Sequence, residues 1–103
     1  MSISGMEFEW GKDKRRRKVE RHHLDFLDGV LVLSGEYYCR YSPRHGEERW
    51  LAIRSVGGIE IAVVFTMRGE GGETIRIISV RRAKRRERRQ YHAHLRERGP
   101  ATD

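Results

Sequence analysis

The chain has 103 residues, enough for one compact domain with a modest core, so extended multi-domain chemistry is excluded. It carries 22 Lys and Arg against 15 Asp and Glu, a net charge of +7, and a single cysteine that cannot form an internal disulfide. No apolar run reaches the length of a membrane span or a signal peptide, so we expect a cytoplasmic protein with no membrane partner.

The chain is expected to begin with a short strand and a helix. Residues 6–10 alternate Phe8 and Trp10 with glutamates, which indicates a strand or a lead-in that packs its aromatic rings inward. Residues 12–22 contain no Gly or Pro and consist mostly of good helix formers, so they predict a largely solvated helix.

The next two segments give weaker signals. Residues 24–33 are ambiguous, and we expect a short helix that runs into a strand because residues 30–33 are β-prone. Residues 34–48 contain Gly, Ser and Pro among several tyrosines, and they predict an irregular excursion.

The second half of the chain predicts three strands and a closing helix. The strands cover residues 49–54, 59–67 and 74–81. Glycine-containing turn signals separate them, which favours an antiparallel meander. Residues 84–98 predict a helix with only a thin apolar stripe. We therefore expect one α+β domain over residues 1–103, a small antiparallel sheet flanked by N-terminal and C-terminal helices, with flexible ends at 1–5 and 99–103.

Positive charge gathers in two of these segments. Residues 81–98 hold nine Lys or Arg against two Glu, and residues 12–21 hold seven Lys or Arg against Asp13 and Glu20. Lys and Arg that neutralise phosphates release condensed counterions, so such clusters favour a polyanionic partner. An acidic protein is a second possible partner, and a solvated helix face is the alternative without one.

Several motifs occur in the order found in one protein family. They are FEW (residues 8–10), the spacing from Lys14 to His22 followed by Phe26, EERW (47–50), VVFTMRG (63–69), IRIISVRRA (75–83) and RRERRQY (85–91). In these motifs the chain resembles the BrnT toxins, which belong to the RelE and ParE superfamily of toxin–antitoxin modules. The resemblance extends over residues 6–91.

This resemblance implies a small fold with an antiparallel sheet flanked by helices and a metal-independent ribonuclease activity that arrests translation. It also implies neutralisation by a ribbon-helix-helix antitoxin similar to BrnA, and binding of operator DNA only by the toxin–antitoxin complex. The superfamily also contains members that poison DNA gyrase without cutting RNA.

Without a metal, RNA cleavage has to use the 2'-hydroxyl of the RNA as its nucleophile. The protein must help to remove the proton of this hydroxyl, stabilise the charge on the phosphorane and protonate the leaving 5'-oxygen. The five histidines do not join Cys or carboxylate groups at ligand spacing, so we expect no metal and no cofactor.

Three residues of the first helix are candidates for proton transfer and RNA binding. Lys14, Lys18 and His22 are four residues apart and would lie along one helix face. Neighbouring positive charges lower one another's pKa, which would make either lysine a better base and His22 a proton shuttle. From the spacing alone a solvated surface row is favoured. Lys14 and His22 also match the family that the chain resembles, and on that basis we predict that they are catalytic.

The remaining candidates lie on the strands and the closing helix. Arg68, Arg76 and Arg81 fall on strands or strand ends, which can hold a guanidinium rigidly against a phosphate. Because all three also lie in segments that resemble the BrnT toxins, we predict that they are catalytic. Alternatively, Arg76 covers the solvent face of the sheet and Arg68 belongs to a turn. The predicted RNA-binding residues are Lys18, Ser79, Arg82, Lys84, Arg85, Arg88 and Tyr91. Tyr91 could be the general acid or a platform on which a base stacks, but it is better explained as a buried aromatic anchor for the closing helix.

Two other classes of function remain open. A non-catalytic nucleic-acid binder, or a gyrase-poisoning member of the same superfamily, needs only the two basic segments. A pure interaction module needs only an acidic protein partner. A catalytic role would be indicated if Lys14→Ala or His22→Ala abolished cleavage with little loss of RNA affinity.

Overall fold

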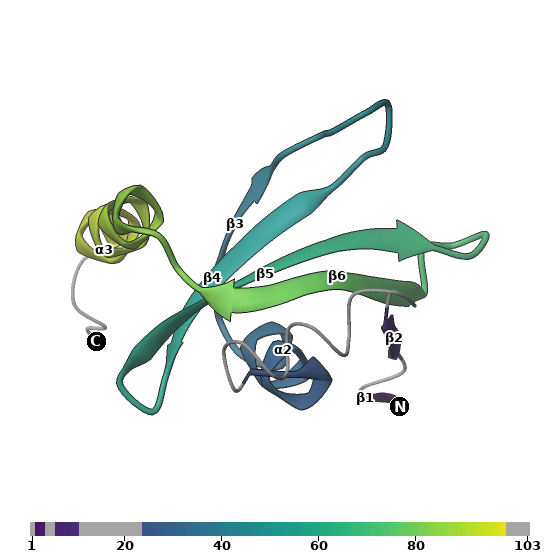
Figure 1. Ribbon diagram of the computed structural model, residues 1–103, viewed down its shortest axis with the longest axis horizontal. Coiled ribbons are helices and arrows are strands. Elements are labelled where there is room, and N and C mark those ends of the chain that lie inside the picture. Colours follow the sequence, from purple (N-terminus) through teal and green to yellow (C-terminus); the bar gives the residue numbers. More distant parts are fainter. Residues whose placement is uncertain (1, 4–5, 11–23, 99–103) are drawn as a thin grey trace.

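The computed structural model describes residues 2–3, 6–10 and 24–98. Within them six strands form one sheet in the order β1-β2-β6-β5-β4-β3, accompanied by two helices (Figure 1). The elements are β1 (Ser2–Ile3), β2 (Met6–Trp10), α2 (Phe26–Leu33), β3 (Tyr38–Tyr41), β4 (Trp50–Val56), β5 (Ile59–Arg68), β6 (Thr74–Arg82) and α3 (Arg85–Arg98). This is the α+β class that the sequence predicts.

The strands from β3 to β6 form the expected antiparallel meander. The β3–β4 hairpin turns at His45 and Gly46, which both have positive φ (52° and 77°), as a tight hairpin turn requires. β2 then pairs with β6 in parallel, with Phe8 opposite Ile75, so the complete sheet is mixed. β6 therefore lies in the interior of the sheet, with a strand on each side.

Residues 26–33 are helical throughout, so the predicted change from helix to strand is wrong. The Asp25 side chain accepts the N–H of Leu27 at 3.1 Å, and Asp28 accepts the N–H of Asp25 at 2.9 Å, which together form a capping box. Val30 and Val32 are almost completely buried. Their packing outweighs the β-preference of valine.

Two strands lie in stretches for which the sequence predicted none, the irregular segment 34–48 and the flexible end 1–5. β3 lies within residues 34–48, and β1 pairs with β2 near the start of the chain. The side chains of β3 are exposed or half-buried, so this strand lacks the apolar alternation by which a longer, buried strand is recognised.

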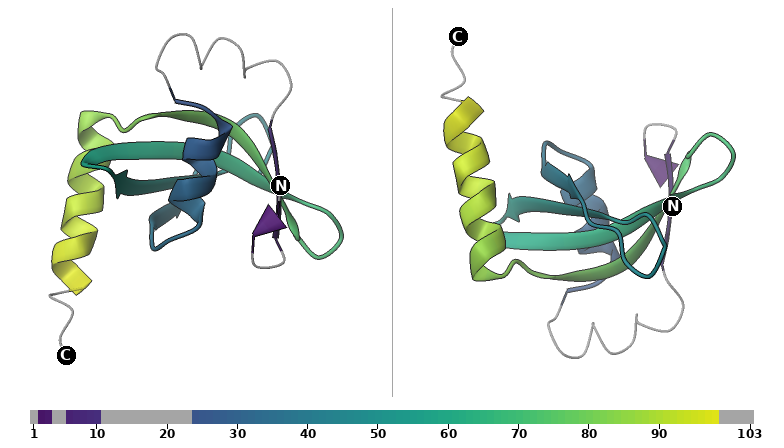
Figure 2. Two further views of the ribbon diagram at one scale, coloured as in Figure 1. Left: turned by 90° about the horizontal axis from the view of Figure 1, so that it is seen from below. Right: turned by 90° about the horizontal axis from the view of Figure 1, so that it is seen from above.

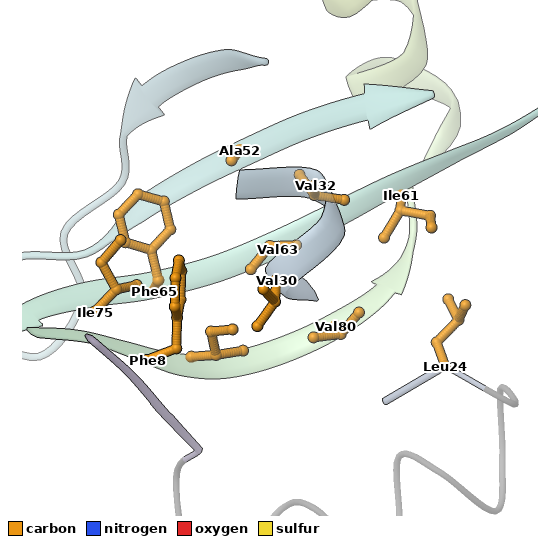
Figure 3. Packing of buried hydrophobic residues seen from close by; sticks show 11 residues of the cluster. Phe8, Leu24, Val30, Val32, Ala52, Ile61, Val63, Phe65, Ile75 and Val80 are labelled. Atoms are coloured by element: carbon orange, nitrogen blue, oxygen red, sulfur yellow. The ribbon is translucent and has the colours of Figure 1, made fainter. Parts of the chain in front are cut away.

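Each face of the sheet carries a hydrophobic cluster. α2 packs over the larger one, shown in Figure 3, which comprises Phe8, Leu24, Val30, Val32, Ala52, Ile61, Val63, Phe65, Ile75, Ile77 and Val80. The smaller one comprises Leu51, Ile53, Ala62, Ala83 and Tyr91. α3 lies across one end of the sheet and contributes Tyr91 to the smaller cluster (Figure 2).

A β-bulge in β6 decides which of its side chains point away from α2. The register with β5 shifts between Val64 and Phe65, which leaves Ile78 as the extra residue. The residues of β6 in the larger cluster are Ile75, Ile77 and Val80. Because strand side chains alternate between faces, Arg76 and Arg81 both point to the face opposite α2.

Gly29 allows α2 to approach β6 closely. A Cβ at this position would lie 2.9 Å from Cγ2 of Val80 and 3.1 Å from Cδ1 of Ile77, both of them fully buried. Gly29→Ala should therefore lower the free energy of unfolding by about 1–3 kcal/mol, because overpacking outweighs the better helix propensity of alanine, about 1 kcal/mol. Urea unfolding measures the change.

The matched control for this variant is Leu31→Ala on the exposed side of the same helix, which should change stability by less than about 0.5 kcal/mol. A Gly29→Ala protein more stable than the wild type would show that Val80 and Ile77 move aside at little cost.

Candidate nucleic-acid interface

The face of the sheet opposite α2 contains a cleft of about 300 Å³, which we name the basic cleft. Its lining residues are Arg40, Ser42, Arg44, Arg49, Leu51, Val64, Ile78, Ser79, Arg81, Lys84 and Glu87. The three aliphatic side chains come from neighbouring strands, β4, β5 and β6. Five lining residues are Arg or Lys and one is a carboxylate, so the cleft has an excess of positive charge.

Arg40 reaches the basic cleft from β3, the strand at the edge of the sheet. It pairs with Leu51 of β4, which places both side chains on the same face. Its Nε is buried and has no hydrogen-bond partner among the described residues. A buried N–H without an acceptor is costly, so a phosphate or carboxylate oxygen that enters the cleft would remove that cost.

Glu87 fixes the position of Arg81 at the end of β6. Its two oxygens accept Nη1–H and Nη2–H of Arg81 at 2.8 and 2.9 Å, and Oε1 also accepts the backbone N–H of Lys84 at 2.7 Å. The Glu87 side chain is only 8 % exposed. Burial raises the pKa of Glu87, but the hydrogen bonds from Arg81 and Lys84 and their charges lower this pKa by more. Glu87 is therefore ionised and a weak base.

A second carboxylate, Glu47, lies among three arginines next to the basic cleft. Its Oε1 accepts Nε–H of Arg49 at 2.7 Å, and its Oε2 is 4.0 Å from Nη2 of Arg68. The hydrogen bond from Arg49 lowers the pKa of Glu47, and the charges of Arg49, Arg68 and Arg76 lower it further. Arg68 and Arg76 therefore lie close enough to Glu47 for their charges to lower its pKa.

The structure places all three predicted catalytic arginines on the face of the sheet opposite α2. Arg81 lines the basic cleft, whereas Arg68 and Arg76 lie beside it near Glu47. Each has a carboxylate neighbour, and that of Arg76 is Glu9, whose oxygen is 2.6 Å from Nε.

The predicted RNA-binding residues divide into separate groups. Ser79 and Lys84 line the basic cleft. Arg85 and Arg88 line a wider groove of about 620 Å³ along α3, together with Glu60, Arg89, His92, Ala93 and Arg96. Arg82 is exposed at the end of β6.

Tyr91 occupies the interior rather than either of these surfaces. It is 7 % exposed and belongs to the smaller hydrophobic cluster. Its hydroxyl oxygen accepts the N–H of Ser55 at 3.1 Å, so it ties α3 to β4. This position is that of an aromatic anchor for the helix.

Three predicted residues, Lys14, Lys18 and His22, lie outside the described residues. Sequence reasoning missed the contribution of residues 40–49, which supply Arg40, Ser42, Arg44 and Arg49 to the basic cleft. A polar residue at every second position, Arg40, Ser42 and Arg44, was the available signal, because it is typical of one face of a strand.

Within the described residues, no group of three or more His, Cys, Asp and Glu side chains is placed to hold a metal ion. In that same part of the chain, neither helix is long and apolar enough to cross a membrane.

The ion pair between Glu87 and Arg81 leads to a prediction about stability. Glu87→Gln should lower the free energy of unfolding by about 2–3 kcal/mol near neutral pH, because Arg81 loses its charged, bidentate acceptor. The folded-state pKa of Glu87 is below the unfolded value of about 4.3, so its contribution is complete above that pH and is lost as the pH falls through the folded-state pKa. The difference between wild type and variant should therefore shrink in acid.

Urea unfolding between about pH 7 and about pH 3 tests this prediction. Glu97→Gln makes the same chemical change at an exposed position of α3 and should alter stability by less than about 0.5 kcal/mol. Equal effects of the two substitutions would contradict a structural role for the pair.

Comparison with known proteins identifies the family of the chain. No match was found among curated proteins or among solved structures. Residues 10–87 match the family described as the ribonuclease toxin BrnT of type II toxin–antitoxin systems. The matched region includes β4, β5 and β6 and every residue that lines the basic cleft. The resemblance seen in the sequence motifs is thus confirmed, and the chain belongs to the BrnT family of ribonuclease toxins of type II toxin–antitoxin systems.

Proposed function

We propose that the chain is a metal-independent endoribonuclease that acts in the cytoplasm, cleaves RNA and thereby inhibits translation until an antitoxin neutralises it. The observation that carries the proposal is the basic cleft, in which five cationic side chains meet: Arg40 from β3, Arg44 and Arg49 from the connection between β3 and β4, Arg81 from β6, and Lys84 from just before α3. The family supplies the substrate class, RNA.

The basic cleft suits the phosphate at the scissile bond. Arg40 presents a buried, unpartnered Nε among the described residues, and Ser79 adds a hydroxyl. Arg81 is already oriented by Glu87, so it needs no reorganisation as negative charge develops on the phosphorane. Arg68 and Arg76 extend the positive surface along the RNA backbone.

Proton transfer requires groups other than the two cleft residues in the Arg81–Glu87 ion pair. Glu87 is a weak base because Arg81 and Lys84 lower its pKa, and a guanidinium is a donor with no acceptor atom and does not give up its proton in proteins. We therefore assign proton transfer to Lys14 and His22. The 2'-oxygen attacks phosphorus as its proton leaves, the bond to the 5'-oxygen breaks, and that oxygen takes up a proton. The products are a 2',3'-cyclic phosphate and a 5'-hydroxyl.

The antitoxin is proposed to be a ribbon-helix-helix protein similar to BrnA that uses acidic residues to fill the basic cleft. The toxin–antitoxin complex, rather than the toxin alone, would bind operator DNA.

The mechanism predicts cleavage of RNA in the presence of EDTA. Wild-type protein should give fragments that end in 2',3'-cyclic phosphate, whereas a Lys14→Ala, His22→Ala double variant should give none and should bind RNA with nearly unchanged affinity. Analysis of the new 3' ends measures the first effect, and filter binding measures the second.

Failure of the wild type to cut in EDTA, with restored cutting on addition of Mg²⁺, would contradict the metal-independent mechanism. Absence of cleavage under both conditions, even with ribosomes present, would favour a non-catalytic binder of nucleic acid or of gyrase.

The basic cleft leads to a second prediction, which concerns the role of Arg40 in cleavage. Arg40→Ala should lower kcat/KM for a defined RNA oligonucleotide by about 10²-fold, because a positioned donor to the phosphorane is lost. Arg40→Lys should recover only part of the loss, since lysine keeps the charge without the planar fork. The slope of log affinity against log salt should fall by about 0.7 for the lost phosphate contact.

Arg86→Ala is the matched control, because Arg86 is exposed on α3 and lines neither the basic cleft nor the α3 groove. Equal losses in Arg40→Ala and Arg86→Ala would indicate that only the overall charge matters.

A further inference from the structure

β3 forms one edge of the sheet and pairs only with β4 among the described residues. The N–H of Ser42 donates to the carbonyl of Arg49 at 2.7 Å, and the N–H of Arg44 donates to that of Glu47 at 3.0 Å. In an antiparallel ladder, residues that bond the partner strand alternate with residues that do not.

Arg40 therefore bonds to β4 through its main chain, whereas Cys39 and Tyr41 direct their N–H and C=O groups away from the sheet. Pro43, the next outward position, has no N–H to offer, so within β3, as the structure describes it, the outward N–H donors are those of Cys39 and Tyr41. Such a row of main-chain groups has the spacing and the direction needed to hydrogen-bond an added strand.

The two sides of this edge differ in chemistry. On the side of the basic cleft, β3 and the hairpin present Arg40, Ser42 and Arg44. On the α2 side they present Cys39, which is exposed, and Tyr41, which is 49 % exposed. A strand added here would need acidic residues on one side and apolar residues on the other.

Charge also distinguishes the two ends of the sheet. Towards the opposite edge, β2 carries Glu7, which is exposed, and Glu9, which pairs with Arg76. An acidic segment would be repelled there and attracted to β3. An extended peptide suits the β3 edge better than RNA does, because RNA has no main-chain N–H and C=O groups at the spacing of a strand.

We propose that an extended acidic segment of the antitoxin adds to β3 as a seventh strand of the sheet. Its main chain bonds to Cys39 and Tyr41, its acidic side chains lie beside Arg40 and Arg44, and its apolar side chains cover Tyr41. An acidic side chain beside Arg40 provides the acceptor that Nε lacks within the described structure and occupies the place of an RNA phosphate. Inhibition by this route rests on the proposed function of the basic cleft.

Amide hydrogen exchange in the wild-type chain tests strand addition directly. The probe is the cognate antitoxin, co-purified with this chain as the complex. Exchange at the N–H of Cys39 and of Tyr41 should be fast in the free chain and at least about tenfold slower in the complex. The N–H of Arg40, bonded to β4 in both states, is the internal control and should be slow throughout.

Cys39 offers a second readout because it is the only cysteine in the chain. Its alkylation by iodoacetamide should slow several-fold in the complex, whereas an RNA oligonucleotide alone should leave the rate unchanged. Protection of Cys39 and Tyr41 by RNA without antitoxin would assign the edge to nucleic acid and overturn the proposal.

A pair of variants distinguishes the contribution of the main-chain N–H of Tyr41 to antitoxin binding from that of its side chain. Tyr41→Pro removes the outward N–H at an edge position, where proline is tolerated, and should weaken antitoxin binding by about tenfold relative to Tyr41→Ala, which keeps the N–H. Neither variant should lose RNA cleavage, since Tyr41 does not line the basic cleft. Circular dichroism checks that both fold, and the exchange experiment on the wild type does not depend on them.

If the complex forms but exchange at Cys39 and Tyr41 is unchanged, the proposal is overturned. Arg40, Arg44 and Pro43 would then serve only to protect an exposed sheet edge against aggregation. A chain that is protected at these amides but does not cut RNA would refute the proposed function while strand addition stands. The two failures are thus distinguishable.

Discussion

The buried carboxylate of Glu87 holds together the parts of the structure on which the candidate interface depends. It joins the end of β6 to the first turn of α3 through Arg81 and the N–H of Lys84. A carboxylate at this end of a helix also interacts favourably with the helix dipole. α3 is densely positive, so an acidic residue at its start favours both the helix and its position across the sheet.

The face of the sheet opposite α2 carries two kinds of arginine, those with a carboxylate neighbour and those with none among the described residues. Carboxylates bond directly to Arg49, Arg76 and Arg81, and Glu47 lies 4.0 Å from Arg68, so each of these arginines has a negative neighbour that reduces repulsion among the cations. Arg40 and Arg44 make no such ion pair within the described residues, and both belong to the β3 end of the basic cleft. The attraction for an incoming anion should therefore be greatest near β3, the same strand whose main chain is open to a partner.

The parts of the fold that sequence analysis predicted are those with strong local signals. The strands around Val63 and Ile77 follow runs of β-branched residues, and α3 follows an uninterrupted helical composition. β3 was missed because it is short and only half-buried. The predicted set of interface residues was incomplete because Arg40 and Arg49 join the basic cleft through the pairing of β3 with β4. Long-range pairing of this kind leaves little trace in a local pattern.

The bulge at Ile78 has a consequence for how this interface can change. Arg76 and Arg81 are an odd number of positions apart, so in a regular strand they would point to opposite faces. The one extra residue brings both to the face opposite α2. Loss of Ile78 would remove the bulge and leave the two arginines four positions apart, so a regular strand would still carry both on the face opposite α2. Exchange of Ile78 for another apolar residue would keep the bulge and the same alternation. The direction of Arg81 should therefore survive both the replacement and the loss of Ile78.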